Sequence, residues 1–153
     1  MLISGVAADK NVAKIRVAGL GNDPESTFRL LNLLDRNNLN IDVMIQSLGK
    51  DGTKSVSFTV AKPDMLRTID VLNDNKDLLG IKKLDYDENV AKVSVIGAGV
   101  RSHSGVAAKM FGALANAGIN TEMVTTSEIR ITALIDEAYA DQAMRAIHET
   151  FLE

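Results

Sequence analysis

The stretch DKNVAKIRV at residues 9–17 returns as DENVAKVSV at residues 87–95, an offset of 78 residues. A second pair, NNLNID at 37–42 and AGINTE at 117–122, is offset by 80 residues. A third pair, 57–60 and 132–135, is offset by 75 residues. Because the offset changes only across the intervening loops, the repeats predict two copies of one module of about 75–80 residues.

Apolar periodicity within the first copy predicts the order βαββαβ. The expected strands cover 14–19, 40–46, 56–60 and 81–86, and the expected helices begin at Pro24 and at Pro63. Asn37-Asn38 ends the first helix, whose buried stripe we expect to include Phe28, Leu31 and Leu34. In the strand 40–46, alternation places Ile41, Val43 and Ile45 on one face.

The second copy repeats this order but ends before its last strand. Its expected strands contain Val93 and Val95 and cover 119–126 and 129–135. Its expected helices carry Val106, Met110, Phe111 and Leu114, and Ala140, Met144, Ile147 and Phe151. The segment before DENVAK is a strand, so the matching segment before DKNVAK, Leu2–Ala8, is expected to supply the missing one. We therefore predict an α+β chain of two ferredoxin-like βαββαβ modules, one (11–89) inserted in the other (1–10 and 90–153).

Composition excludes several classes of function. With no cysteine among 153 residues, disulfides, thiolate metal sites and a cysteine nucleophile are excluded. The 17 Lys and Arg against 20 Asp and Glu give no reason to expect a nucleic-acid partner, and the central strands KIRVAG and KVSVIG lack the aromatics of RNA-binding sheets. No apolar run is long enough to cross a membrane, so we expect a soluble cytoplasmic protein.

Several motifs resemble catalytic or ligand sites only in part. Gly97-Ala98-Gly99, with Glu122 further on, partly matches a dinucleotide fingerprint, but Ser102 stands in the third glycine position. Ser102-His103-Ser104 has no third orienting carboxylate, and we interpret it as helix-capping loop.

Other candidate groups are interpreted in the same way. His148 suits a helix C-terminus. The acids Asp85, Asp87 and Glu88 lack the glycine and the final glutamate of a calcium loop. We predict no catalytic residue, no metal and no cofactor. An acylphosphatase-type hydrolase stays an alternative, with Arg101 as its one loop arginine.

Each copy contains a loop between a strand and a helix, Gly19–Ser26 and Gly97–Gly105, followed by a strand that carries an acid near its start. Free N–H groups at a helix N-terminus bind carboxylates, and Asp42 or Glu122 offers a partner for an ammonium group. The pattern indicates either a pocket for a free amino acid or a solvated helix cap.

Four stretches resemble the tandem ACT domains of aspartokinases. They are NLNIDVMIQS, DGTKSVSFTV, AKVSVIGAGVRSHSGVAAKMF and INTEMVTTSEIRI. The resemblance covers essentially the whole chain, and it implies feedback control by lysine, threonine or both, bound at ACT interfaces of a homodimer. It also implies a partner that carries the kinase activity, either a catalytic domain or a separate subunit, since this chain has no kinase domain. The alternative is a stand-alone amino-acid-sensing ACT protein that regulates another enzyme.

By motif, the resemblance implies effector contacts in both copies. In the first they are Asn22, Asp23, Pro24, Glu25, Ser26, Asn40, Ile41, Asp42 and Gln46; in the second they are Ser102, His103, Ser104, Gly105, Val106, Asn120, Thr121, Glu122, Thr126, Ser127 and Glu128. Two positions depart from the family pattern. Glu25 replaces a glycine in the first loop and is expected to crowd or repel a ligand carboxylate; Ser104 replaces a proline in the second loop.

Overall fold

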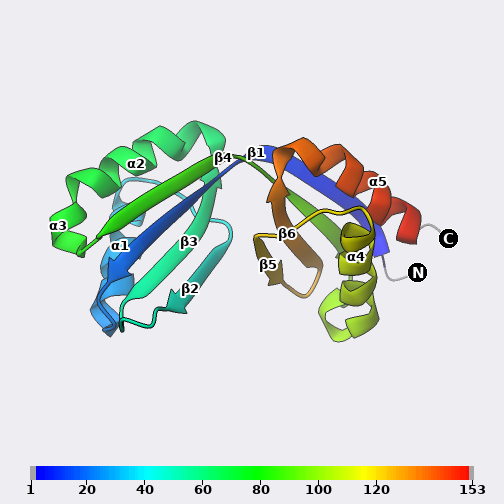
Figure 1. Ribbon diagram of the computed structural model, residues 1–153, viewed down its shortest axis with the longest axis horizontal. Coiled ribbons are helices and arrows are strands. Elements are labelled where there is room, and N and C mark those ends of the chain that lie inside the picture. Colours follow the sequence, from blue (N-terminus) through cyan, green and yellow to red (C-terminus); the bar gives the residue numbers. More distant parts are fainter. Residues whose placement is uncertain (1–2, 152–153) are drawn as a thin grey trace. The chain divides into compact units, whose positions relative to one another are not determined.

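The computed structural model describes residues 3–151 and divides the chain into two compact units (Figure 1). Asn11–Glu88 form one, called the inner unit here; Met1–Lys10 and Asn89–Glu153 form the other, called the outer unit. Strands β1 (Ile3–Leu20) and β4 (Lys83–Gly97) each contribute residues to both units. The strands expected separately at 2–8 and 14–19, and at 81–86 and Val93–Val95, are therefore continuous. Leu2 and residues 152–153 lie outside the described residues.

The inner unit has a four-stranded sheet of order β2-β3-β1-β4. Its other elements are α1 (Pro24–Arg36), β2 (Met44–Leu48), β3 (Lys54–Ala61), α2 (Met65–Asp74) and the short α3 (Lys76–Leu79). β3 pairs antiparallel with both β1 and β2, so that Phe58 is opposite Ile15 on one side and Met44 on the other. The edge position of β2 leaves one side of that strand without a partner in the sheet.

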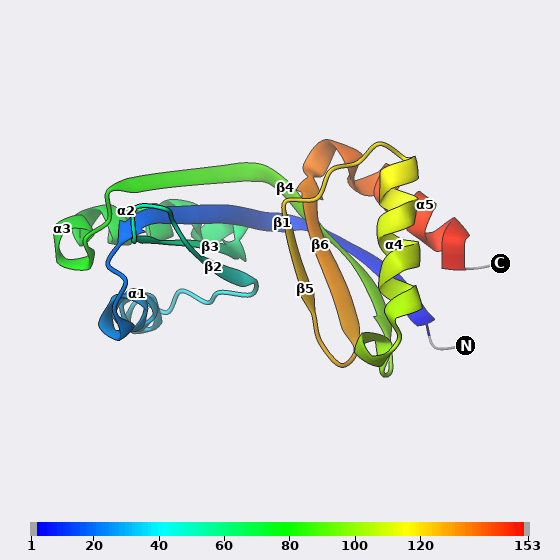
Figure 2. The same cartoon turned by 60° about the horizontal axis from the view of Figure 1, so that its bottom comes forward.

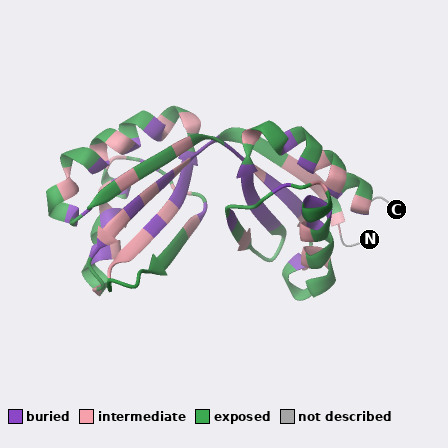
Figure 3. Ribbon diagram, viewed as in Figure 1, coloured by how far each residue is buried: buried purple, intermediate pink, exposed green. Residues whose placement is uncertain are grey.

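One face of the inner sheet carries the core. Ile15 and Val17 of β1 and Phe58 of β3 are fully buried against Leu34 of α1 and Leu72 of α2. These are the alternating apolar positions that the sequence assigns to strand interiors. In Figure 3, buried and exposed residues alternate along the helices, as one-sided packing of an amphipathic helix requires.

Phe28 is not part of this core, contrary to the prediction. Its side chain is 65% exposed, and the buried positions of α1 are Ser26, Leu30 and Leu34. These three residues lie four apart, on one stripe of the helix, whereas Phe28 is two positions from Leu30 and so points away from the sheet. The helix is apolar over a wide arc, and periodicity alone could not select which side packs.

The strand expected at 40–46 is also displaced, and β2 begins only at Met44. Asp42 N–H donates to the Thr59 carbonyl (3.2 Å), and Thr59 N–H donates to the Val43 carbonyl (2.9 Å). Two residues therefore face one, which is the arrangement of a β-bulge. Ile41 packs on the core before the bulge, and Met44 packs on it after the bulge. The alternation of inward and outward side chains therefore shifts by one residue at the bulge, and Ile45 is exposed.

The outer unit repeats the same arrangement, with strand order β1-β4-β6-β5. Its further elements are α4 (Ser104–Asn116), β5 (Met123–Thr126), β6 (Arg130–Asp136) and α5 (Ala140–Phe151). β6 pairs antiparallel with β4 and β5. β5 is shorter than the expected strand 119–126. The helices α4 and α5 lie side by side on one face of the sheet (Figure 2), where Met110, Leu114, Ile147 and Phe151 meet the strands.

The fourth strand of the outer sheet comes from the N-terminal part of β1. Ser4 Oγ donates to the Ile96 carbonyl (3.1 Å), and Lys92 lies 3.9 Å from Asp9, so residue numbers rise along one strand as they fall along the other. The predicted fold of two ferredoxin-like βαββαβ modules, one inserted in the other, is confirmed. Among the described residues, no helix has both the length and the apolar character that a membrane span requires.

Candidate functional site

The loop between β1 and α1 of the inner unit is ordered by its own polar side chains. Ser26 is buried, and its hydroxyl donates to the Asp23 carboxylate. This hydrogen bond is the main reason why the pKa of Asp23 lies below its ordinary value. Asn22, Pro24 and Glu25 are exposed, and Glu25 lies in the first turn of α1. Two acidic side chains therefore stand at the N-terminus of this helix.

Two side chains that the sequence analysis missed connect this loop to the sheet. Thr27 Oγ1 donates to Oε1 of Gln46 on β2 (2.6 Å). Lys54, the first residue of β3, donates through Nζ to the Asp23 carbonyl (2.9 Å) and to Thr27 Oγ1 (3.3 Å). The register places Lys54 opposite both Leu20 and Leu48, where β1 and β2 end. The sequence does carry a signal for this position of Lys54, because the residue directly follows the Asp51-Gly52-Thr53 turn and begins the return strand of the hairpin.

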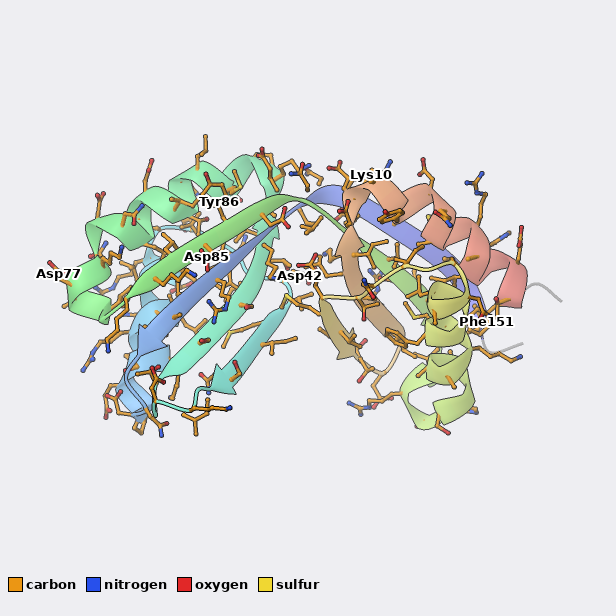
Figure 4. All side chains as sticks on the ribbon, viewed as in Figure 1. Lys10, Asp42, Asp77, Asp85, Tyr86 and Phe151 are labelled. Atoms are coloured by element: carbon orange, nitrogen blue, oxygen red, sulfur yellow. The ribbon has the colours of Figure 1, made fainter. Side chains whose placement is uncertain are left out.

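The structure separates the predicted residues of the inner unit into two groups. Gln46 joins the loop, but Asp42 lies in the bulge at the other end of β2, where Figure 4 labels it, and Asn40 and Ile41 precede it in the chain. Asp42 is opposite Thr59, five residues along β3 from Lys54, which is about 17 Å at about 3.4 Å per residue. Within one unit, the loop therefore does not face the start of the next strand.

In the outer unit, a different pair of side chains joins the corresponding loop to the sheet. Arg101 donates to the carboxylate of Glu128 (2.5 Å), which follows β5. The Nδ1 atom of His103 lies 3.1 Å from the Gly99 carbonyl. Ser102, Ser104 and Gly105 are exposed, and Val106 packs against the outer core.

The remaining predicted residues of the outer unit also fall into two groups. Thr126 is opposite Ile131, and Ser127 N–H donates to the Arg130 carbonyl (2.8 Å), which keeps both residues in the hairpin that holds Glu128. At the other end of β5, Glu122 N–H donates to the Leu134 carbonyl (2.8 Å). Asn120 and Thr121 line a hollow of about 360 Å³ at the C-terminal end of α4.

The two loops are therefore equivalent in position but differ in charge. The first turn of α1 contains Glu25, whereas the first turn of α4 contains no acid. Unneutralised N–H groups at a helix N-terminus favour a carboxylate. The outer loop has the better electrostatic setting for the carboxylate of an amino acid.

The alternative chemistries gain no support from this geometry. Arg101, the arginine that an acylphosphatase-type site requires, is held by Glu128. Asp85 is paired with the cations Arg16 (3.5 Å) and Lys83 (3.8 Å). Among residues 3–151, no cluster of three or more His, Asp or Glu is arranged to hold a metal ion. His148 lies exposed in the last turn of α5, where a cation is favourable.

Comparison with known proteins agrees with the fold. Residues 93–151 match the family model of the ACT domain. The fold of the chain is thus that of the ACT domains.

The chain is similar over nearly its whole length to parts of aspartate kinases. It is 42% identical to a chain in the crystal structure of aspartokinase alpha and beta subunits, covering 97% of this chain and 98% of that one, with a TM-score of 0.90. It is 32% identical to the regulatory subunit of aspartate kinase from Thermus thermophilus in its ligand-free form, covering 99% of both, with a TM-score of 0.93. The chain therefore belongs to the family of aspartate kinase regulatory ACT domains.

Curated relatives are longer than this chain. The aspartokinase of Pseudomonas aeruginosa is 37% identical over 150 residues, which are 98% of this chain but 36% of that protein. The chain thus spans about a third of the length of such relatives, and it corresponds to their regulatory part and not to a catalytic domain.

Proposed function

We propose that this chain is the effector-sensing part of a cytoplasmic aspartate kinase and that it binds lysine, threonine or both as feedback signals. The observation that carries the proposal is the full-length similarity to a regulatory subunit of aspartate kinase, with 99% of both chains covered. The polar loops before α1 and α4 supply donors and acceptors that suit a free amino acid.

The effector contacts are proposed to come from two copies of the chain. Within one unit, Lys54, which binds the loop at Asp23, and Thr59, which is opposite Asp42, lie about 17 Å apart along β3. This is farther than one amino acid reaches with its two charged groups. An effector that touches both the loop and Asp42 therefore takes them from different copies, and the same reasoning applies to residues 102–106 and 120–122.

Exposed edge strands support a homodimer. β2 and β5 stand at the two ends of the strand order. Apolar residues on these strands are exposed, with Ile45 at 37%, Leu48 at 63% and Val124 at 42%. Bare strand edges pair readily with another chain. Pairing of these edges between copies would bring the loop of one copy to the strand of the other.

Regulation then follows from differential binding. An effector that binds one arrangement of the dimer more tightly stabilises that arrangement, and a coupling of about 1–3 kcal/mol is enough for feedback control of a catalytic domain or subunit. The reciprocal effect is that the catalytic partner changes effector affinity by the same factor.

Titration calorimetry with lysine and threonine, separately and together, tests the proposal, with light scattering to establish the dimer. We expect saturable heat from at least one of the two amino acids. No heat with either, on a folded dimer, would contradict it. Asp42→Asn should weaken binding if this carboxylate holds the ammonium group, while Asp35→Asn, an exposed acid on α1, serves as the matched control.

A further inference from the structure

The inner loop already holds an ammonium group, and it belongs to the chain itself. Lys54 Nζ lies 2.9 Å from the Asp23 carbonyl and 3.3 Å from Thr27 Oγ1. Thr27 in turn donates to Gln46 Oε1, so the acceptors around the ammonium group form one connected set. Hydrogen bonds from a charged donor are stronger than those between neutral groups.

The outer unit has no counterpart to this lysine. Ala18 is opposite Ser55 in the inner sheet, and Ile96 is opposite Arg130 in the outer sheet. These two pairs occupy equivalent positions in the repeat. Lys54, which precedes Ser55, is therefore equivalent to Ile129, which precedes Arg130. Ile129 is 55% exposed and offers no charge. The outer loop has a cation of its own in Arg101, but that guanidinium is paired with the Glu128 carboxylate. Only in the inner loop, therefore, does an ammonium group bind a loop carbonyl and the first turn of the helix.

The surrounding charges of the inner loop oppose a second ligand. Asp23 and Glu25 stand at the start of α1 and offset the positive end of its dipole. The inner loop therefore already contains both kinds of charge that an amino acid would bring, carboxylates at the helix N-terminus and the Lys54 ammonium group. An incoming amino acid would have to displace these groups before its own carboxylate and ammonium group could take their places.

We propose that Lys54 is a built-in substitute for the effector ammonium group, which closes the inner loop without ligand and leaves the loop before α4 as the one that responds to effector. The inference rests on the proposed function and adds that each chain takes up one equivalent of amino acid. Lys54 is a positioning residue in this scheme, because it acts by holding Asp23 and Thr27.

The test compares Lys54→Met with Lys50→Met, since Lys50 is exposed in the turn of the same hairpin, and with Lys54→Arg, which keeps a cationic donor. Amide hydrogen exchange of residues 22–27 should speed up by about tenfold or more in Lys54→Met, as expected when a charge-assisted hydrogen bond is lost. Lys50→Met and Lys54→Arg should exchange close to the wild-type rate.

The second part of the proposal is that only the loop before α4 responds to effector. Titration of the wild-type chain with L-lysine and L-threonine, followed by amide chemical shifts, tests it. Shifts should appear at residues 102–106 and not at 22–27, with one equivalent bound per chain. In Lys54→Met, signals of Thr27 and Gln46 should respond to L-lysine, or to methylammonium as the simplest probe, whereas in the wild type the same signals should not change even at about tenfold higher concentration.

Two results would overturn the inference. One is wild-type uptake of two equivalents with shifts at 22–27 while Lys54 is intact; the other is equal exchange rates in Lys54→Met and Lys50→Met. If no variant binds either amino acid, the proposed function fails, whereas the exchange comparison still decides whether Lys54 closes the loop.

Discussion

The Arg101 guanidinium donates a hydrogen bond of 2.5 Å to the Glu128 carboxylate, and this bond joins the loop before α4 to the turn between β5 and β6. The side chains are 56% and 71% exposed. Exposed ion pairs contribute little to stability, because water and salt screen them. The pair is therefore better suited to holding a loop in place than to holding the fold together.

Glu128→Gln should change the free energy of unfolding by less than about 1 kcal/mol, and should nevertheless accelerate amide exchange in residues 99–103. Glu149→Gln removes the same charge from an exposed position on α5 and is the control. Urea denaturation and hydrogen exchange measure the two effects. A loss of stability well above 1 kcal/mol would show that the pair has a structural role.

The Asp23 carboxylate should titrate at lower pH than an ordinary aspartate, chiefly because the Ser26 hydroxyl donates to it. Since the folded-state pKa is lowered, the stabilisation is present above the unfolded-state pKa and disappears as pH falls through the folded-state value. Ser26→Ala should raise the pKa of Asp23 toward its ordinary value. It should also reduce the loss of folding stability that accompanies protonation of Asp23 at acid pH.

Carboxyl NMR titration of the wild type and of Ser26→Ala measures the pKa of Asp23 in each and contains an internal control. The pKa of Asp51 is also lowered, mainly by the Thr53 hydroxyl in the β2–β3 turn (2.7 Å). Ser26→Ala should leave the pKa of Asp51 unchanged. An unchanged pKa of Asp23 in Ser26→Ala would mean that a group other than the Ser26 hydroxyl stabilises the charged carboxylate.

Leu34 and Phe28 lie on the same helix but should respond very differently to truncation. Leu34 is 1% exposed and Phe28 is 65% exposed. Leu34→Ala should cost about 2–5 kcal/mol, from lost burial and the cavity left behind, and Phe28→Ala should cost no more than about 0.5 kcal/mol in the monomer. Urea denaturation at low protein concentration checks both, and similar losses would contradict the observed packing of α1.

The contrast between these two residues illustrates what a sequence can and cannot predict. Alternation and repeats are local patterns, so the three repeat pairs and the apolar periodicity were enough to predict two βαββαβ modules, one inserted in the other. The bulge at Asp42 and Val43 depends on Thr59 of another strand, and no local pattern signals it. Because the bulge changes the phase of alternation, the predicted face of Ile45 was wrong.

The candidate site was harder to predict for the same reason. Motifs identified the loops, but an isolated lysine in a hairpin resembles any surface lysine. The acceptors of Lys54 belong to Asp23 and Thr27, which lie 31 and 27 positions away in the chain. Only the register of β3 against β1 and β2 brings these groups together.

Gly19 should be among the least replaceable residues of the inner unit. Its φ of +87° lies in the left-handed region, and a Cβ added there would lie 2.5 Å from the Cβ of Lys82. Gly52 has a φ of +81° but no atom within 4 Å of such a Cβ, so Gly52→Ala is a control that shares the conformational strain without the clash. Gly52→Ala should cost about 1–2 kcal/mol.

Gly19→Ala should cost more than Gly52→Ala, because the backbone must also move away from Lys82, whose N–H donates to the Ala18 carbonyl (2.9 Å). Urea denaturation of the two variants measures the difference. Since a rotamer change of Lys82 cannot move its Cβ, relief requires displacement of the chain where β1 leads into the loop before α1. Equal costs would show that this junction yields easily, and the loop would then be less rigidly placed than its hydrogen bonds to Lys54 indicate.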